Sequence, residues 1–413
     1  MDGRLALGVR VLGAASRIAV DRVQEAFGGG LPRTPEQLVE REVLDALLHA
    51  HAPEGAEPLP PLRSARLPGV AFESSNCTNF LIEPDFEPLA PRAGATGVTA
   101  SPALPRTLYA KLPCRDLATR TFANAIGFWE TEVAFCRNLA HRVPIRVPKV
   151  HAVAQQGSRF VLLLENLHEL EGATLFINRD MARGTTIERA RRVVQTFAAL
   201  HAAFWGLSEA EREPLLPRRL HPYLAPGGRE TMRALNASAI DRAHRAAPAL
   251  FTRSHAAIAH AAIGKWDALM DVWYAEPLTL IHGDSHLGNC FEYATPEGPR
   301  MGMLDFQGVQ WCRGIRDVQY FLINSLEPEL LAAHEPALID LYVAELGARG
   351  VALDAAEARM QYRAFAFQTL MVAVVSLGVG GMVERSETVE AVLRRSVAAI
   401  DRLGFGEWLA KID

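Results

Sequence analysis

A change in hydrophobic pattern near Leu167 constrains the fold of this 413-residue chain more than any other feature. Before this point, short apolar runs alternate with polar or proline-rich turns, as expected for strands. After it, apolar residues recur at intervals of three and four, which is typical of helices, and the first such helix follows a capping box at Thr185-Thr-Ile-Glu188. The pattern predicts an α+β protein with a small antiparallel sheet lobe, a helical lobe and a cleft between them.

Three segments are expected along the chain. Residues 1–65 should form a helical N-terminal extension, residues 66–167 the sheet lobe, and residues 168–413 the helical lobe with the catalytic loop and acceptor pocket. In the sheet lobe, strands are predicted on both sides of a polar turn within 68–83, and at 107–112, 150–154 and 159–164. One helix is predicted over 118–141, and the Pro-, Ala- and Gly-rich residues 84–106 should form a hairpin loop.

Charge and cysteine content exclude several classes of protein. The net charge is −4 with scattered Lys and Arg, whereas a nucleic-acid-binding protein needs a clustered basic face. The five cysteines are dispersed and include no Cys-x-x-Cys pair, which predicts reduced thiols in the cytoplasm and neither disulfides nor a zinc site. The apolar stretch 365–383 contains Gln368, Ser376 and three glycines, so we expect a buried helix there and no transmembrane segment.

The N-terminal residues are expected to form an amphipathic helix. Arg4, Arg10 and Arg17 interrupt the apolar residues, so the continuous apolar core of a signal peptide is missing. Apolar side chains recur at roughly helical spacing, at Leu5, Val9, Leu12, Ala19, Val23 and Phe27. Packing on the chain's own domain is the favoured interpretation, and peripheral contact with a membrane surface is the alternative.

The segment His282-Gly-Asp-Ser-His-Leu-Gly-Asn289 carries the most chemical information. It follows an apolar strand, and a second apolar run then ends in Met303-Leu-Asp-Phe-Gln307. Phosphoryl transfer needs one carboxylate to accept the proton of the attacking hydroxyl, and a carboxylate and an amide oxygen to hold Mg²⁺ against the phosphates. The spacing therefore predicts Asp284 as the catalytic base and Asn289 and Asp305 as the metal ligands.

Two other interpretations of this segment stay open. Asp284 could simply cap the turn made by His282 and Gly283. Alternatively, His282, Asp284 and His286 alternate along the chain and would point the same way in an extended segment, as in a metallohydrolase. No further His or Asp cluster follows nearby, so the metallohydrolase ranks below the kinase interpretation.

The sheet lobe supplies candidate nucleotide-binding residues. Lys111 lies mid-strand among apolar residues, where a Lys is otherwise unusual, and could hold the α- and β-phosphates of ATP. Glu132 in the following helix could pair with Lys111, and it keeps better phase with the apolar residues of that helix than the competing Glu130. Backbone groups of Glu165 and Leu167, in the run that joins the two lobes, are expected to bond the adenine edge.

Together these segments resemble the protein-kinase-like fold of the aminoglycoside phosphotransferase and choline kinase superfamily, and most closely its ecdysteroid kinase-like branch. The resemblance covers residues 65–325. It rests on YAKL around Lys111, ETEVAF with Glu132, VLLLENL ending at Leu167, AALHAAFW, HGDSHLGN, and MLDFQGVQW followed by GIRDVQYFL. The Asp-Phe-Gln sequence is similar to this branch, and the absence of Ala-Pro-Glu speaks against a protein kinase.

The resemblance implies further roles. It implies that Asp317 braces the catalytic loop through its backbone. No Gly-x-Gly-x-x-Gly is present, and its place is taken by Ser74-Ser-Asn-Cys-Thr-Asn79, which makes Ser75 and Asn76 the candidate phosphate contacts. His201 and Trp205 lie on the apolar face of their helix and are interpreted as structural.

These observations predict an ATP- and Mg²⁺-dependent kinase that phosphorylates a hydroxyl of a small molecule. Residues 206–275 carry seven acidic side chains against eight arginines and one lysine, which disfavours aminoglycosides and choline and favours a neutral or anionic, hydrophobic alcohol. Two alternatives are kept. One is a nucleotide-binding pseudokinase that acts as an interaction module, and the other is an antibiotic or choline kinase.

Overall fold

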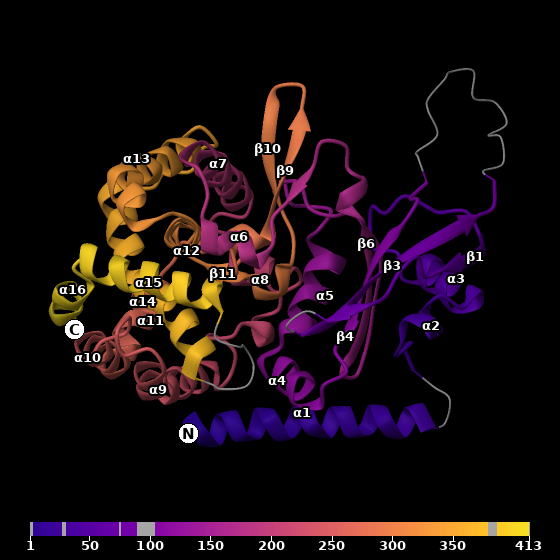
Figure 1. The fold of residues 1–413 in the computed structure, drawn as a ribbon, viewed down its shortest axis with the longest axis horizontal. Coiled ribbons are helices and arrows are strands. Elements are labelled where there is room, and N and C mark those ends of the chain that lie inside the picture. The colour runs from indigo at the N-terminus through magenta and orange to yellow at the C-terminus, as the bar shows by residue number, and fades with distance from the viewer. Residues whose placement is uncertain (1–2, 27–29, 74–75, 89–103, 379–385, 413) are drawn as a thin grey trace. The chain divides into compact units, whose positions relative to one another are not determined.

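The computed structural model describes residues 3–26, 30–73, 76–88, 104–378 and 386–412 (Figure 1). The chain divides into two compact units, each described here by itself. The sheet unit contains residues Arg10–Arg142 and Pro148–Leu170, and the helical unit contains Met1–Val9, Val143–Val147 and Glu171–Asp413.

The sheet unit is built on an antiparallel sheet with the strand order β1-β3-β4-β6-β5, and β2 pairs with β3. Side chains of β4 alternate between its two faces: Leu108, Ala110 and Leu112 pack into an apolar core with leucines of α3, while Lys111 points to the other face. The strands are β1 (Leu62–Arg66), β2 (Phe72–Glu73), β3 (Cys77–Phe86), β4 (Leu108–Pro113), β5 (Val150–Gln156) and β6 (Arg159–Glu165).

The secondary structure of the sheet unit differs from the sequence prediction in two places. Residues 62–65, expected within a helical extension, belong to β1, which pairs with β3. The single helix expected over 118–141 is two helices, because Gly127 adopts a left-handed backbone with φ of 88° that ends the first helix. The helices are α1 (Gly3–Ala26, of which residues 3–9 fall in the other unit), α2 (Pro35–Leu38), α3 (Arg41–Ala50), α4 (Leu117–Ile126) and α5 (Phe128–Asn138).

The helical unit surrounds a fully buried helix, α12 (Ile315–Ser325). The first long helix of the helical unit is α7 (Ile187–Ala203). Its N-cap is Thr186, whose hydroxyl accepts from Arg189 N, whereas the predicted capping box placed the N-cap at Thr185. The other helices are α6 (Asn178–Arg183), α8 (Glu209–Arg212), α9 (Gly228–Ala246), α10 (Arg253–Gly264), α11 (Trp266–Trp273), α13 (Pro328–Gly347), α14 (Ala355–Gly378), α15 (Glu387–Arg402) and α16 (Phe405–Lys411).

Two small sheets accompany these helices. One has the order β10-β9-β7, with β7 (Thr174–Leu175), β9 (Cys290–Thr295) and β10 (Gly298–Met303). The other pairs β8 (Thr279–Ile281) with β11 (Gln310–Cys312). The apolar stretch from Phe365 enters α14 as a buried helix, as predicted, and among the described residues no helix is both long and apolar enough to cross a bilayer.

Strand β11 is fixed by the buried imidazole of His221. Its Nε2–H donates to Trp311 O (2.8 Å), and its Nδ1 accepts from the backbone N–H groups of Tyr223 and Leu224 (3.1 and 3.0 Å). Burial disfavours the charged ring and lowers the pKa of His221 to about 4, although the Trp311 carbonyl partly opposes this shift. The ring is therefore neutral in the folded chain at neutral pH.

This neutral imidazole predicts a pH-dependent stability. Below its ordinary pKa of about 6.5, His221 binds a proton in the unfolded chain but not in the folded chain until about pH 4, so stability falls as pH drops through this window. We expect His221→Gln to reduce the loss of unfolding free energy between pH 7 and pH 5 by about 2 kcal/mol. Urea unfolding at both pH values measures this loss. His168→Gln, at an exposed position, is the control, and an equal pH dependence in the His221 variant and the wild type would contradict the prediction.

Candidate active site

The loop after β8 is shaped by a glycine. Gly283 has a φ of 81°, and a Cβ atom at this position would overlap the carbonyl oxygen of Gly308, so only glycine fits. The close approach of Gly283 to Gly308 joins the loop after β8 to the 3₁₀ turn at Phe306–Gly308. The chain turns sharply here and places Asp284 directly after the strand.

Asp317 at the start of α12 holds this loop through its backbone. Its carboxylate accepts from His282 N (2.6 Å) and Gly283 N (3.0 Å), which is the bracing that the resemblance implied. The carboxylate is also hydrogen-bonded to His201 Nε2 (3.3 Å), and His201 Nδ1 is hydrogen-bonded to the Tyr342 hydroxyl (2.8 Å). The interpretation of His201 as structural therefore holds, because it reaches the loop only through Asp317.

Asp317 is ionised despite its complete burial. Burial alone would raise the pKa of Asp317, but the hydrogen bond and charge of His201 and the charge of Arg316 lower it, so that the net pKa lies below its ordinary value. The guanidinium of Arg316 also donates to Gly283 O, which ties the loop to α12 a second time.

Asp284 lies at the centre of a polar cluster and stays accessible, with about 30% of its side chain exposed. Its Oδ1 accepts from the Tyr320 hydroxyl (3.1 Å), and Asn289 Nδ2 donates to its Oδ2 (3.3 Å) and to its backbone oxygen (2.9 Å). Burial would raise the pKa of Asp284, but His286, His282 and the Tyr320 hydroxyl lower it to a net value below the ordinary range. Asp284 is thus a carboxylate at neutral pH and able to accept a proton.

Asn289 and Asp305, the predicted metal ligands, are linked through the backbone. Leu304 N donates to Asn289 O (3.0 Å), which brings the residue before Asp305 against Asn289. Because the amide nitrogen of Asn289 is bonded to Asp284, its Oδ1 is the atom that a cation would contact. Asp305 adopts a left-handed backbone with φ of 64°, which Asp tolerates better than most residues. Carboxylate and amide oxygens fit a hard cation such as Mg²⁺.

The metallohydrolase interpretation fails on the hydrogen bonds of His282. Its Nε2–H donates to Leu304 O (2.9 Å), and its Nδ1 accepts from Asp284 N (3.2 Å), so neither ring nitrogen is left for a metal. Among the described residues, no group of three or more His, Cys, Asp or Glu side chains could hold a metal ion.

The sequence interpretation missed Tyr320, which bonds directly to Asp284. A signal was present, because Asp317 and Tyr320 are three residues apart in one helix and so lie on neighbouring positions of its surface. Tyr320 is buried, and Arg316 lies over its ring at 4.8 Å from the centroid. Tyr320 is therefore a positioning residue for Asp284.

We expect Tyr320→Phe to lower kcat by about tenfold, because one hydrogen bond that orients the carboxylate, worth roughly 1–2 kcal/mol, is lost. KM for ATP should stay unchanged, since Tyr320 bonds only to Asp284 among these groups. Steady-state kinetics measure both constants. The matched control is Tyr362→Phe, because Tyr362 is also a buried tyrosine but lies in α14. An equal loss of kcat in both variants would show that Tyr320 acts through packing alone.

In the sheet unit, Lys111 and Glu132 form a buried ion pair. Lys111 Nζ lies 2.6 Å from Glu132 Oε1, and the two side chains are 9% and 4% exposed. Lys111 points away from the face of the sheet that packs against α3, and it therefore reaches Glu132 of helix α5. Glu130, on the same helix, is half-buried. The pairing matches the choice of Glu132 over Glu130, and its role toward a nucleotide stays a prediction.

The remaining predicted nucleotide contacts lie at the ends of strands. Asn76 is buried directly before β3, and its backbone oxygen accepts from Cys114 N (3.2 Å), whereas Ser75 lies outside the described residues. Glu165 ends β6 and its N–H donates to Lys149 O (2.8 Å). Leu167 starts a 3₁₀ turn at Leu167–Glu169. Their contacts with adenine and phosphate stay predictions.

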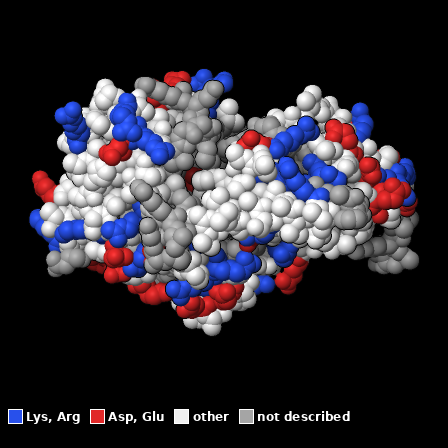
Figure 2. All heavy atoms as spheres, turned by 90° about the horizontal axis from the view of Figure 1, so that it is seen from below, with Lys and Arg blue, Asp and Glu red and all other residues white. Residues whose placement is uncertain are grey.

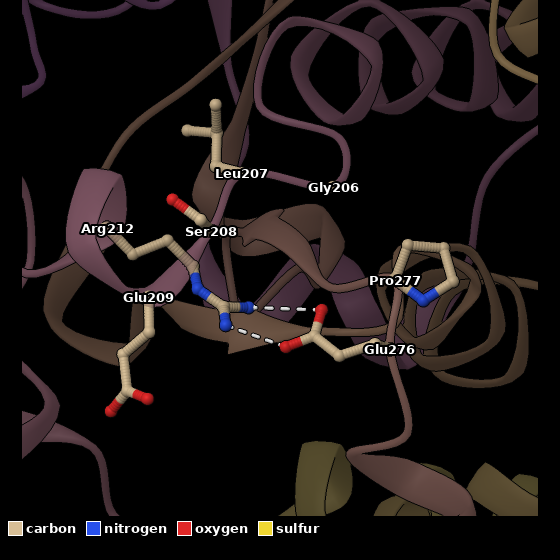
Figure 3. Close-up of a pocket in the computed structure, with 7 residues that line it drawn as sticks. All are labelled: Gly206, Leu207, Ser208, Glu209, Arg212, Glu276 and Pro277. Atoms are coloured by element: carbon tan, nitrogen blue, oxygen red, sulfur yellow. Dashed lines mark hydrogen bonds and ion pairs between the residues drawn. The ribbon is translucent and has the colours of Figure 1, made fainter.

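A hollow of about 580 Å³ lies elsewhere on the helical unit (Figure 3). Arg212 donates to both carboxylate oxygens of Glu276 across it, at 2.6 and 3.4 Å, and residues 206–209 and Pro277 form the rest of its lining. Glu276 also accepts from Leu278 N (2.9 Å) just before β8. None of the predicted site residues lines this hollow, so we assign it no part in catalysis.

Comparisons with known proteins bear on the family and the fold of the chain. The family model described as the ecdysteroid kinase-like family matches residues 115–352. An ethanolamine kinase from Plasmodium vivax has a TM-score of 0.50 at 10% identity, covering 89% of each chain, and this confirms the predicted two-lobed α+β kinase-like fold.

Two further solved structures are similar over most of their length. A putative aminoglycoside phosphotransferase from Ralstonia eutropha has a TM-score of 0.47 at 16% identity, covering 90% of this chain and 98% of its own. A choline kinase from Streptococcus pneumoniae has a TM-score of 0.40 at 9% identity, covering 83% and 94%. No curated protein sequence matches the chain.

Proposed function

The chain belongs to the ecdysteroid kinase-like family, and from this premise we propose that it transfers the γ-phosphoryl group of ATP, with Mg²⁺, to a hydroxyl of a neutral or anionic hydrophobic molecule. Family membership confirms the resemblance drawn from the sequence and makes the chain a phosphotransferase of the small-molecule kinase class. The observation that carries the proposal is the accessible Asp284 carboxylate, which accepts hydrogen bonds from Tyr320 and Asn289. The backbone oxygen of Asn289 in turn accepts from Leu304 N, directly before Asp305.

Asp284 would act on the acceptor hydroxyl. As the hydroxyl oxygen forms its bond to the γ-phosphorus, the bond to ADP breaks, and the hydroxyl proton passes to Asp284. Asn289 Oδ1 and the Asp305 carboxylate would hold Mg²⁺, which supplies neutralisation of the phosphate charge when bound. Lys111, oriented by Glu132, would contact the phosphates, and the buried ion pair between the two side chains supports this role.

Surface ion pairs reduce the weight of the charge count over residues 206–275 as support for the substrate class. Several of the counted arginines form ion pairs at the surface, as Arg218 does with Glu209 and Arg229 with Asp267. The buried cation at the loop is instead Arg316, outside the counted range, and its Nε–H donates to the neutral Gln368 (3.4 Å). The charge of Arg316 is balanced by the carboxylate of Asp317, 3.7 Å away, so the proposed substrate class rests on the excess of basic over acidic side chains in residues 206–275.

Five apolar residues of the helical lobe, Met270, Trp273, Tyr274, Phe365 and Phe367, could offer apolar surface to an acceptor, but most of them fill the core. Met270, Trp273, Phe365 and Phe367 are each at most 1% exposed, and only Tyr274 is half-buried, with its hydroxyl donating to Gln310 (3.4 Å). Tyr274 and Gln310 therefore remain as candidate acceptor contacts.

The full-length chain with Mg·ATP, assayed against a panel of alcohols, tests the proposal. We expect kcat/KM for steroid and acyl alcohols to exceed that for choline, ethanolamine and kanamycin-like polycations by about tenfold or more, a difference of roughly 1.4 kcal/mol. A preference for the cations would overturn the substrate class. ATP binding without turnover of any alcohol would instead favour the pseudokinase.

We also propose a cytoplasmic location. The support is the five dispersed cysteines, all of them buried, which fit reduced thiols. A disulfide detected in protein taken from its native cell would argue against this location.

A further inference from the structure

Helix α1 exposes an apolar face that no other element of the described chain covers. Val9, Leu12, Val20 and Val23 are 56%, 70%, 56% and 60% exposed. At 100° per residue these positions, with Ser16 and Ala19 between them, fall on one face of the helix. Together with Val11, α1 carries five of the twelve large exposed apolar side chains among the described residues, so this face differs from scattered surface residues.

The opposite face of α1 fixes the direction of this apolar face. Ala14, Ile18 and Asp21 are buried, and Asp21 accepts from Ser158 N (2.8 Å) and from the Ser158 hydroxyl. Arg17 donates to Asn124 O (3.1 Å), which adds a second attachment to the sheet unit. The exposure of the apolar face therefore follows from specific bonds on the other side of the helix.

Among the side chains of α1 that the structure describes, the exposed charges are all positive. Between residues 8 and 24, the charged side chains are Arg10, Arg17 and Arg22 and the buried Asp21. By helical spacing, Arg10 and Arg17 lie on one flank of the apolar face and Arg22 on the other. Figure 2 looks from below at the edge where Figure 1 draws α1, and shows uncharged residues in white with Lys and Arg in blue beside them.

We propose that α1 binds the chain to an anionic membrane surface. The apolar face would enter the boundary between headgroups and acyl chains, and the flanking arginines would contact lipid phosphates. With 24 residues, α1 is about 36 Å long and would lie in the plane of the interface. A second copy of the chain fits less well, because a symmetric dimer through this face would bring the arginines of both helices together. This inference does not rest on the proposed reaction.

Sedimentation of the full-length chain with vesicles tests the proposal. We expect binding to vesicles of phosphatidylcholine with phosphatidylglycerol to be about tenfold or more tighter than to phosphatidylcholine alone, since each arginine contributes roughly 1 kcal/mol near an anionic surface. The double variant Leu12→Glu/Val23→Glu and the single variant Arg22→Glu, which leaves the Arg17 bond to Asn124 intact, should each reduce binding by about tenfold or more. Val70→Glu is the matched control, because Val70 is 94% exposed and lies outside α1.

A fluorescent label measures insertion directly. The native cysteines are all buried, so Val20→Cys and Val70→Cys can each be labelled with an environment-sensitive dye. Emission should rise on anionic vesicles only for the label at position 20. The proposal is overturned if anionic and neutral vesicles bind equally, or if Leu12→Glu/Val23→Glu and Arg22→Glu bind like Val70→Glu while circular dichroism shows them folded. It is also overturned if the chain is a dimer that Leu12→Glu/Val23→Glu dissociates, since the occupant of the face is then a second copy.

Discussion

Replacing Asp284 by Asn should lower kcat by about 10²–10⁴-fold, the range that a positioned proton acceptor contributes. The amide has nearly the same size as the carboxylate and can keep bonds to Tyr320 and Asn289, but it cannot take the proton of the acceptor hydroxyl. Mg·ATP affinity should change little, because Asp284 is not a proposed ligand of the metal. Single-turnover kinetics with saturating acceptor measure the chemical step, and calorimetry measures nucleotide binding.

Asp267→Asn is a suitable control for this experiment. Asp267 is an exposed carboxylate of α11 that pairs with Arg229 (3.0 Å), so its loss removes the same charge from the same unit. Unchanged turnover in Asp267→Asn and near-complete loss in Asp284→Asn would support Asp284 as the base. Undiminished phosphorylation by Asp284→Asn would show that Asp284 only caps its turn.

The second large effect is expected at Asp305. Asp305→Ala should weaken Mg·ATP binding by about tenfold or more and lower kcat with it, because the charged oxygen ligand of the cation is removed. Added Mg²⁺ should restore part of the affinity by mass action. Calorimetric titration of Mg·ATP at two Mg²⁺ concentrations measures both effects.

Backbone strain could mimic this result, and a glycine variant separates the two causes. Asp305 has a φ of 64°, where alanine is strained by roughly 1–2 kcal/mol and glycine is not. Asp305→Gly should therefore lose as much Mg·ATP affinity as Asp305→Ala. Recovery of affinity in the glycine variant, or unchanged affinity in both, would mean that the Asp305 carboxylate does not bind the metal.

Much of the candidate site could be predicted because its chemistry is local in sequence. Asp284 and Asp305 closely follow short apolar strands, Asn289 lies five residues after Asp284, and hydrogen bonds link Asn289 to Asp284 and to Leu304. Lys111 was found because a charged residue inside an apolar strand is unusual, and helix phase alone selected Glu132 as its partner. In both cases the residue pattern within a single strand or helix was enough for the prediction.

What sequence reasoning missed depends on contacts between distant segments. Tyr320 and Arg316 reach the loop from α12, 36 and 33 residues away from their partners Asp284 and Gly283. Strand β1 follows a proline-rich stretch and has little periodicity of its own, because only pairing with β3 makes it a strand. Counting charges over residues 206–275 could not show which arginines already pair with carboxylates at the surface, as Arg218 does with Glu209.

The clamp that Asp317 forms on the catalytic loop has an entropic consequence. The loop is fixed by the chain's own groups, with His282 and Gly283 bonded to Asp317 and Arg316 bonded to Gly283. Ordering a flexible loop costs about 1–2 kcal/mol per residue, and a loop ordered by folding avoids this cost at every turnover. Binding free energy then remains for aligning the reacting atoms. Since the clamp joins the loop to the fully buried α12, loss of activity on heating should coincide with melting of the helical core and not precede it.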